Sequence, residues 1–262
     1  MSVSNLYLGL ILDKYKGKDL TTHSYAINHL KGQLQSWAQT CYVDILTSGS
    51  CAKGTAISLS SDVDLMVSLT PECHKDDGGL KRCYDSLFTF LASEKYAGVR
   101  KQNVSVRIEF CGLEIDVTPA RQMTGYQNYH SLYVSKTDSW KQTNIKMHIN
   151  DVSMSGRLDE IRLLKIWREK HQIDFPSIYL EYLTIKHLLF GKSKAATNLA
   201  DNFYHCLCEL AKNEDNPLLK RVDDPANTNN ILSDLLTFSE KQKIFQAAQV
   251  AISENDFSKI VS

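Results

Sequence analysis

The sequence predicts an α+β protein, because its first half mixes strand-like and helical patterns while its second half is helical throughout. Between about residues 40 and 120, apolar and polar residues alternate in short runs with the period of two that is typical of strands. From residue 156 onward, apolar residues recur at the spacing of three and four that is typical of helices. A chain of 262 residues, 43% of them hydrophobic, can bury one large core or two modest ones. We therefore expect two domains, residues 1–150 and residues 151–262.

The first domain is expected to be a mixed sheet with helices packed on it. A Ser/Thr-rich start leads into residues 21–39, where apolar residues have the spacing of an amphipathic helix. A second helix is predicted at about residues 80–93, after the polar turn H-K-D-D-G-G. Alternating segments predict four strands, at residues 42–46, 62–69, 104–110 and 113–117.

The second domain is expected to consist of helices, joined to the first domain by the polar segment 124–155. Four helical patterns cover residues 156–171, 176–191, 195–210 and 239–252. In the first of these helices, apolar residues occur nearly all round the axis, which is typical of a buried helix. Lys165 lies within this apolar surface, so its ammonium group either reaches the protein surface or needs a buried anionic partner. A cleft between the two domains is the expected place for a ligand.

Composition excludes several classes of protein. Lys plus Arg and Asp plus Glu both number 30, so the zero net charge gives no general attraction to nucleic acid or to an anionic membrane. The seven cysteines, an odd number scattered along the chain, do not form a disulfide framework and fit a reduced cytosol. No apolar run approaches the roughly 20 residues that are needed to span a bilayer. We therefore expect a cytoplasmic protein with neither a membrane nor a nucleic acid as its partner.

Three carboxylates mark the predicted sheet. In the pattern D-V-D, Asp62 and Asp64 point to the same side of a strand, and the intervening Val63 points into the core. In L-E-I-D-V, Asp116 projects from a neighbouring strand in the same way. A D-V-D pattern taken alone is most often the solvated face of an edge strand. Three carboxylates on two strands repel one another unless a cation lies between them, and they can hold two Mg²⁺ ions about 3.5 to 4 Å apart for phosphoryl transfer.

A Gly-Ser turn precedes these carboxylates along the chain. Gly49 and Ser50 follow a predicted strand, where small residues let backbone N–H groups and a hydroxyl approach phosphate oxygens closely. A Gly-Ser pair alone is a commonplace turn, but it becomes specific when K-G-T and then D-x-D follow it. We expect this turn to bind phosphate locally, since the chain as a whole carries no positive charge.

The segment G-S-C-A-K-G-T-A-I-S-L-S-S-D-V-D-L and the later E-I-D-V together resemble the nucleotidyltransferase superfamily typified by DNA polymerase beta. The resemblance implies a polymerase beta-like core, made of a mixed sheet with helices. It also implies that Asp62, Asp64 and Asp116 are the catalytic residues and that they bind Mg²⁺, or alternatively Mn²⁺. Gly49 and Ser50 would then hold the triphosphate of a nucleotide.

The helical half resembles a narrower family, the bacterial cyclic-oligonucleotide synthases, which are related to cyclic GMP-AMP synthase and to oligoadenylate synthase. The segments that carry this resemblance are R-L-L-K-I-W-R, F-P-S-I-Y-L-E and D-P-A-N-T-N-N. The resemblance implies a helical domain of the oligoadenylate synthase type, with the active site in the cleft between the two domains. It makes Lys165 and Ser177 contacts of the triphosphate and Tyr179 a further nucleotide contact. Ile178 follows Ser177, where many relatives have a Tyr that stacks on a base.

This family resemblance implies an enzyme that joins nucleoside triphosphates, ATP among them, into a cyclic di- or trinucleotide and releases pyrophosphate. The product would activate a separate effector in bacterial anti-phage signalling. Three alternatives stay open: a linear nucleotide-adding enzyme of the oligoadenylate synthase or tRNA CCA-adding type, a non-catalytic nucleotide-binding sensor, and a toxin or antibiotic-modifying nucleotidyltransferase. A linear enzyme must grip a long polyanion, for which the neutral chain has little basic surface. A sensor is expected to lack a carboxylate, and none is missing here.

Overall fold

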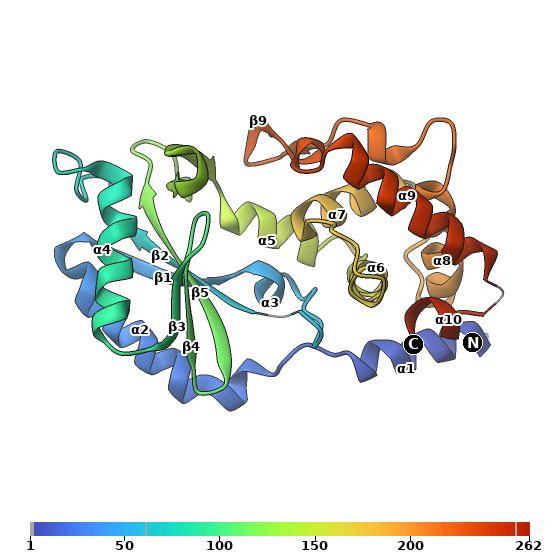
Figure 1. The fold of residues 1–262 in the computed structure, drawn as a ribbon, viewed down its shortest axis with the longest axis horizontal. Coiled ribbons are helices and arrows are strands. Elements are labelled where there is room, and N and C mark those ends of the chain that lie inside the picture. The colour runs from blue at the N-terminus through green and yellow to red at the C-terminus, as the bar shows by residue number, and fades with distance from the viewer. Residues whose placement is uncertain (1–2, 61, 255) are drawn as a thin grey trace. The chain divides into compact units, whose positions relative to one another are not determined.

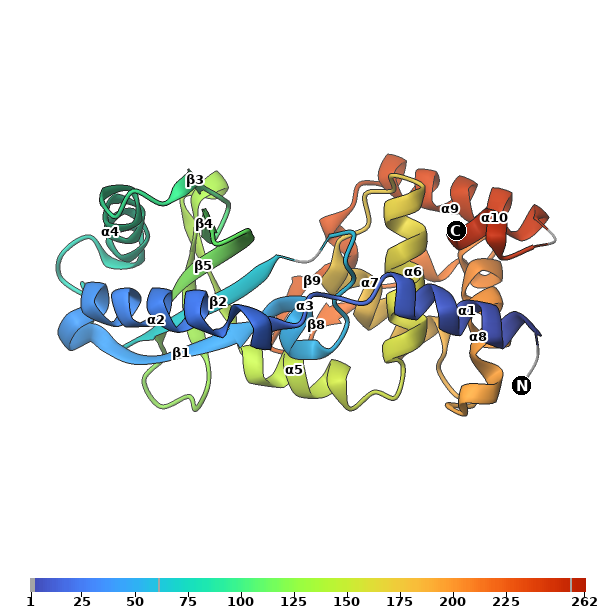
Figure 2. The ribbon, with the colours of Figure 1, turned by 90° about the horizontal axis from the view of Figure 1, so that it is seen from below.

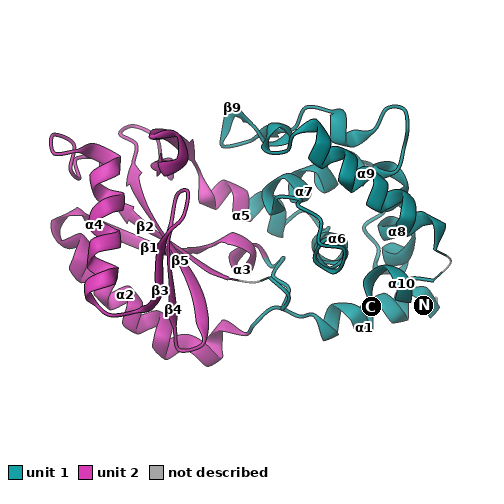
Figure 3. Ribbon diagram, in the orientation of Figure 1, with its two compact units in different colours: residues 1–18, 54–60, 150–262 teal, residues 19–53, 61–149 magenta. Residues whose placement is uncertain are grey.

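The computed structural model describes residues 3–60, 62–254 and 256–262 and divides into two compact units. The sheet unit consists of residues 19–53 and 61–149, and the helical unit consists of residues 1–18, 54–60 and 150–262 (Figure 3). The sequence-based division also falls near residue 150, but it puts residues 1–18 and 54–60 in the first domain. In the structure both segments belong to the helical unit. The chain therefore passes through the helical unit between the Gly-Ser turn and the D-V-D pattern.

A seven-stranded mixed sheet forms the centre of the sheet unit (Figure 1). Its strands lie in the order β1-β2-β5-β4-β3, with β6 beside β5 and β7 beside β6. β2 and β5 run parallel, whereas all the other neighbours are antiparallel. The strands are β1 (Tyr42–Ser48), β2 (Val63–Leu69), β3 (Ala97–Lys101), β4 (Val106–Phe110), β5 (Leu113–Gln122), β6 (His130–Val134) and β7 (Ser139–Thr143).

Helices α2 (Ser24–Ala38) and α4 (Gly79–Ser93) cover one face of this sheet (Figure 1). The buried cluster beneath them joins apolar residues of both helices to every second residue of β2 and of the first half of β5. Burying these apolar side chains is the main stabilising contribution of the unit. The intervening residues of β2 and β5 must therefore face the other side of the sheet.

All four predicted strands are confirmed, and the sheet of this unit contains three further strands that the sequence does not predict. β3 and β7 are edge strands whose side chains are mostly exposed, so they show no alternation that would mark them. β6 buries three of its five residues, including the adjacent Leu132 and Tyr133, so its pattern is irregular too. The segment 124–155, expected to be a polar linker, thus contributes two strands and the helix α5 (Ile145–Ser153).

Cys41 and Cys73 are joined by a disulfide bond, which corrects the expectation of reduced cysteines. The two residues are 32 positions apart, but Cys41 immediately precedes β1 and Cys73 follows β2. Because β1 and β2 are antiparallel, with Tyr42 opposite Leu69, the two cysteines meet at one end of the strand pair. Cysteine spacing alone contains no information about this pairing, which depends on the register of the sheet. The other five cysteines are free.

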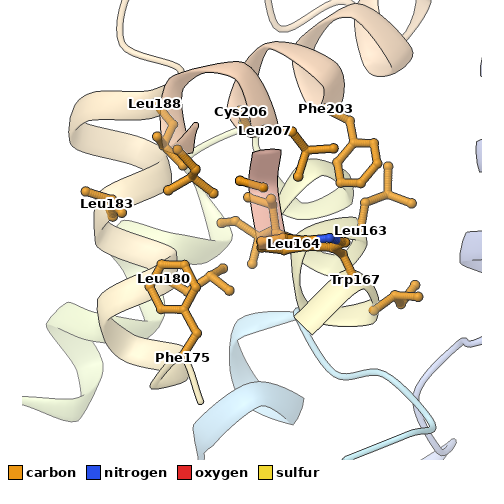
Figure 4. Packing of buried hydrophobic residues seen from close by; sticks show 14 of the residues in the cluster. Leu163, Leu164, Trp167, Phe175, Leu180, Leu183, Leu188, Phe203, Cys206 and Leu207 are labelled. Atoms are coloured by element: carbon orange, nitrogen blue, oxygen red, sulfur yellow. The ribbon is translucent and has the colours of Figure 1, made fainter. Parts of the chain in front are cut away.

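The helical unit is built around a single apolar core, in which α6 is buried as the sequence predicts. Leu163, Leu164 and Trp167 of α6 pack with Leu180 of α7 and Leu207 of α8 (Figure 4). α1 lies against α6 and α8 (Figure 2). A small antiparallel pair, β8 (Asp223–Asp224) and β9 (Asn227–Ile231), contains the segment D-P-A-N-T-N-N. The helices are α1 (Val3–Lys14), α6 (Leu158–Lys170), α7 (Ser177–Leu183), α8 (Leu199–Leu210), α9 (Phe238–Ser253) and α10 (Ser258–Val261).

None of the helices that the structure describes combines the length and the apolar composition required to cross a lipid bilayer.

Candidate active site

Asp64 and Asp116 lie directly opposite each other on the parallel strands β2 and β5. Val63 and Ile115, the pair beside them, are buried beneath the helices. Because side chains alternate along a strand, both carboxylates project from the opposite face of the sheet. Asp62 immediately precedes β2 and shares a hydrogen-bond donor with Asp116. Asp64 and Asp116 therefore project from neighbouring strands, whereas Asp62 lies just before β2 and not on the strand where the sequence predicts it.

Gly49 approaches Asp64 more closely than any other residue type could. β1 ends at Ser48, which lies opposite Asp64, and Gly49 then opens the short helix α3 (Gly49–Lys53). The φ of Gly49 is +63°, and a Cβ atom built on it would lie 1.7 Å from Oδ2 of Asp64. The thiol of Cys51 also donates to the backbone oxygen of Asp62, at 3.7 Å. The Gly-Ser turn thus lies beside the carboxylates, as the sequence predicts, with Ser50 partly exposed.

Arg107 on β4 binds the same carboxylates, although no motif marks it. Its Nε donates to Oδ1 of Asp116 at 2.9 Å, and its Nη2 donates to Oδ2 of Asp116 at 2.7 Å. Nη2 also donates to Asp62, and Nη1 donates to Glu114 at 3.0 Å. One guanidinium group therefore spans three carboxylates.

The position of Arg107 follows from the β4-β5 hairpin. Cys111 and Gly112 form its two-residue turn, and both have the positive φ values typical of a tight hairpin turn. This turn puts Phe110 opposite Leu113 and, three pairs further along, Arg107 opposite Asp116. The alternation of V-R-I-E-F, combined with this short turn, is the sequence signal that would have identified Arg107.

Burial and like charges shape the electrostatics of the site. Burial, followed by the charges of Asp116 and Asp62, raises the pKa of Asp64 to about 6, against smaller opposing effects of Lys53 and Arg107. Burial also raises the pKa of Asp62, while Arg107 acts to lower it. The hydrogen bonds from Arg107 to Asp116 raise the pKa of the guanidinium, which is always charged. The site thus combines several acids with two basic side chains, Arg107 and Lys53.

The donor atoms of this site suit a hard divalent cation. Carboxylate oxygens are the ligands that Mg²⁺ prefers, and a cation would relieve the repulsion that, in addition to burial, raises the pKa of Asp64. Within the described ranges, no three His, Cys, Asp or Glu side chains are already arranged to hold a metal ion. Asp62 and Asp116 instead direct oxygens toward Arg107. Asp62, Asp64 and Asp116 are the residues that could hold a metal after these oxygens are released.

Lys165 lies inside the helical unit with a buried anionic partner, so it does not reach the surface. Its Nζ donates to Oε1 of Glu181 at 2.7 Å and to Oγ1 of Thr55 at 2.8 Å. The Thr55 hydroxyl donates in turn to Oε1 of Glu181 at 2.8 Å. Lys165 is 2% exposed, and both of its partners are fully buried. This triad fixes the segment 54–60, which connects the Gly-Ser turn to the carboxylates, within the helical core.

Ser177 and Tyr179 occupy different environments at the start of α7. The Ser177 hydroxyl accepts a hydrogen bond from Arg168 at 3.0 Å and is partly exposed. Tyr179 is fully buried; its hydroxyl donates to the backbone oxygen of Leu218 at 3.0 Å and its ring packs edge-on against Phe175. The structure therefore places Tyr179 in the core, which differs from the nucleotide contact expected of it.

A family model of the Second Messenger Oligonucleotide or Dinucleotide Synthetase domain matches residues 1–155 of the chain. The chain is also similar to the cyclic AMP-AMP-AMP synthase of Escherichia coli strain MS 115-1, with 27% identity over 194 residues. This match covers 68% of the chain and 60% of that enzyme, so the chain matches less than two thirds of its relative's length.

Solved structures show that the whole fold recurs. CdnC of E. coli MS115-1 with ATP has a TM-score of 0.71 and 22% identity, with 96% of this chain and 91% of that chain covered. The Bradyrhizobium diazoefficiens CD-NTase CdnG in complex with GTP has a TM-score of 0.76 and 13% identity, with 96% and 90% covered. CdnC bound to HORMA-deltaN matches at a TM-score of 0.72 and 22% identity, with 96% and 90% covered. These TM-scores establish a common fold, and the family model covers more than half of the chain, so the chain belongs to the second messenger oligonucleotide or dinucleotide synthetase family.

Proposed function

We propose that the protein is a nucleotidyltransferase that joins nucleoside triphosphates into a cyclic di- or trinucleotide and releases pyrophosphate. The observation that carries this proposal is the convergence of Asp62, Asp64 and Asp116 beside Gly49. Glycine at position 49 lets the carboxylate of Asp64 lie against the backbone of the turn, so that acids that could hold metal ions and a turn that could hold phosphate are adjacent, as nucleotidyl transfer needs. Membership of the second messenger oligonucleotide or dinucleotide synthetase family supports the same function.

Asp62, Asp64 and Asp116 would hold the metal ions in this reaction. When bound, two Mg²⁺ or Mn²⁺ ions would lower the pKa of an acceptor ribose hydroxyl and neutralise charge at the α-phosphate. Asp116 is the proposed acceptor of the hydroxyl proton. The backbone of Gly49 and the hydroxyl of Ser50 would orient the triphosphate for in-line attack, with pyrophosphate as the leaving group.

Lys165 and Ser177 are proposed as further contacts of the triphosphate. The Ser177 hydroxyl is partly exposed, which suits this role. A phosphate oxygen would have to reach the buried Nζ of Lys165 beside Glu181 and Thr55, which both bind it. We assign no base-stacking role to Tyr179, because its ring is buried.

The relatives suggest the substrates and the setting. One relative is a cyclic AMP-AMP-AMP synthase, and solved structures hold ATP or GTP, so purine nucleoside triphosphates are the first substrates to test. The complex of CdnC with HORMA-deltaN suggests that a HORMA protein is a candidate partner. We place the enzyme in the bacterial cytoplasm, in anti-phage signalling in which the cyclic product activates a separate effector.

The test is to incubate the purified protein with all four nucleoside triphosphates and Mg²⁺, treat the mixture with phosphatase, and analyse it by mass spectrometry. A phosphatase-resistant product with the mass of a closed ring of nucleotides supports the proposal and identifies its bases. A dephosphorylated linear ladder would assign the protein to the linear synthases instead. Asp62→Asn/Asp64→Asn should abolish the product, whereas Asp76→Asn, which changes an exposed carboxylate outside the site, should leave it unchanged.

A further inference from the structure

Arg107 is held at the carboxylates by the sheet itself. All of β4 pairs with residues 113–117 of β5, with Val106 opposite Val117 and Arg107 opposite Asp116. The backbone of Arg107 therefore cannot move away without breaking this ladder, and only rotation of its side chain can release the guanidinium. The Arg107 side chain is 16% exposed, so its bonds to the acids are only partly screened by water.

The guanidinium uses the oxygens that a metal ion would need. It engages both oxygens of Asp116 and one oxygen of Asp62. A planar guanidinium forms strong, directional bonds with carboxylates, and these bonds must weaken before a cation can take the same lone pairs. Arg107 supplies positive charge to Asp62 and Asp116, and Lys53 acts in the same sense on Asp64, so that the acids can lie close together.

We propose that Arg107 is a positioning residue that occupies the metal site as a countercharge and competes with the first divalent cation for Asp62 and Asp116. This inference rests on the proposed function, in which these acids bind metal. Arg107 keeps the acids assembled without metal and makes metal binding weaker than the same acids would allow alone. Its role is thus opposite to that of a residue that supports a metal ligand.

The test measures Mn²⁺ binding to the metal-free full chain, by the electron paramagnetic resonance signal of free Mn²⁺, together with the rise of Tm on adding Mn²⁺. Arg107→Gln should bind Mn²⁺ about tenfold more tightly than the parent and should show the larger Tm rise, because one charge-assisted competitor is gone. Arg107→Lys, which keeps the charge but cannot bridge three acids, should lie between the two. Circular dichroism with saturating Mn²⁺ checks that each variant is folded.

Arg100→Gln is the matched control. Arg100 lies opposite Arg107 on the edge strand β3, is exposed, and makes no ion pair with any residue that the structure describes. Arg100→Gln should leave the affinity for Mn²⁺ unchanged. If Arg100→Gln also binds Mn²⁺ more tightly, the loss of any nearby positive charge explains the gain in affinity. That result would overturn the role given to Arg107.

Asp64→Asn separates this inference from the proposed function. If the parent binds Mn²⁺, Asp64→Asn abolishes that binding, and Arg107→Gln binds no more tightly than the parent, then the competition is refuted and the proposed function stands. If Asp64→Asn leaves Mn²⁺ binding unchanged, the acids are not the metal site, and both proposals fail.

Discussion

Oδ2 of Asp64 lies 1.7 Å from the position that a Cβ atom of residue 49 would occupy. Real Cβ atoms do not approach other heavy atoms within 3.0 Å, so any side chain at Gly49 must displace the carboxylate. The positive φ of +63° adds a second requirement for glycine at this position. Glycine at position 49 therefore allows the turn that is predicted to hold phosphate to lie against the strand that is predicted to hold metal.

We predict that Gly49→Ala reduces product synthesis by about 100-fold or more, since displacements of about 1 Å in an active site have effects of this size. It should also lower the free energy of unfolding by about 1–3 kcal/mol, because alanine is strained at this φ. Activity assays and urea unfolding measure the two effects. Gly32→Ala is the control: Gly32 lies within α2, no atom lies within 4 Å of its Cβ position, and alanine there should stabilise by about 0.5–1 kcal/mol. Parental activity in Gly49→Ala would show that Asp64 can move freely.

The pKa of Asp64 predicts how stability depends on pH. Its folded-state pKa of about 6 exceeds the ordinary value of 3.8, so the folded state retains the proton over a range in which the unfolded state has lost it. The free energy of unfolding should therefore fall as pH rises through that range, by up to about 3 kcal/mol from this group. Asp64→Asn should remove this decrease, so that the metal-free variant is more stable than the parent at pH 7.5.

Urea unfolding in EDTA between pH 4 and pH 8 measures this difference. Asp76→Asn, in an exposed loop, should follow the parent at every pH. Parallel curves for the parent and Asp64→Asn would mean that Asp64 titrates as an ordinary carboxylate. Adding Mg²⁺ should restore stability to the parent at neutral pH but not to Asp64→Asn, because only the parent keeps all three carboxylates.

The Cys41–Cys73 disulfide gives a separate prediction. Protein purified without reductant should yield one cross-linked peptide pair, and dithiothreitol should lower the free energy of unfolding by about 3 kcal/mol, because the bond closes a loop that spans 32 positions. Peptide mapping by mass spectrometry and urea unfolding with and without reductant check both results. Cys41→Ser/Cys73→Ser should match the reduced parent and lose its response to dithiothreitol. An unchanged response in this double variant would point to another cysteine pair.

Residues that share a strand or a short turn could be predicted from the sequence. Alternation placed Asp64 and Asp116 on one face, although Asp62 lies just before β2, and the two-residue turn of the β4-β5 hairpin contains enough information to place Arg107 opposite Asp116. Periodicity also predicted that α6 is buried, and therefore that the ammonium group of Lys165 either reaches the surface or has a buried anionic partner. In each case the distances along the chain are short and the geometry of the element fixes the neighbours.

Contacts between distant segments could not be predicted in this way. The sequence predicted that a buried Lys165 needs an anionic partner, but it did not identify Glu181 as that partner. It also did not identify the hydroxyl of Thr55, which lies 110 positions from Lys165 along the chain. The assignment of residues 54–60 to the helical unit depends on these contacts, since short segments carry no pattern of their own. The environment of Tyr179 could not be predicted for the same reason. Only the packing of α7 determines whether its ring contacts a nucleotide base or Phe175.

The buried triad of Lys165, Glu181 and Thr55 yields the last prediction. Lys165→Met should lower the free energy of unfolding by about 3–5 kcal/mol, because it leaves the fully buried Glu181 without its cation. Lys212→Met is the control, since Lys212 pairs with Glu209 at the surface and such pairs contribute about 0–1 kcal/mol.

The double variant Lys165→Met/Glu181→Leu separates charge from packing. It should recover most of the lost stability, because replacing both members of a buried ion pair by apolar residues removes the unpaired charge. Product synthesis should stay low in this variant even where stability returns, since the proposed triphosphate contact of Lys165 is gone. Full recovery of synthesis together with stability would show that Lys165 serves only to neutralise the buried Glu181 and makes no contact with the nucleotide.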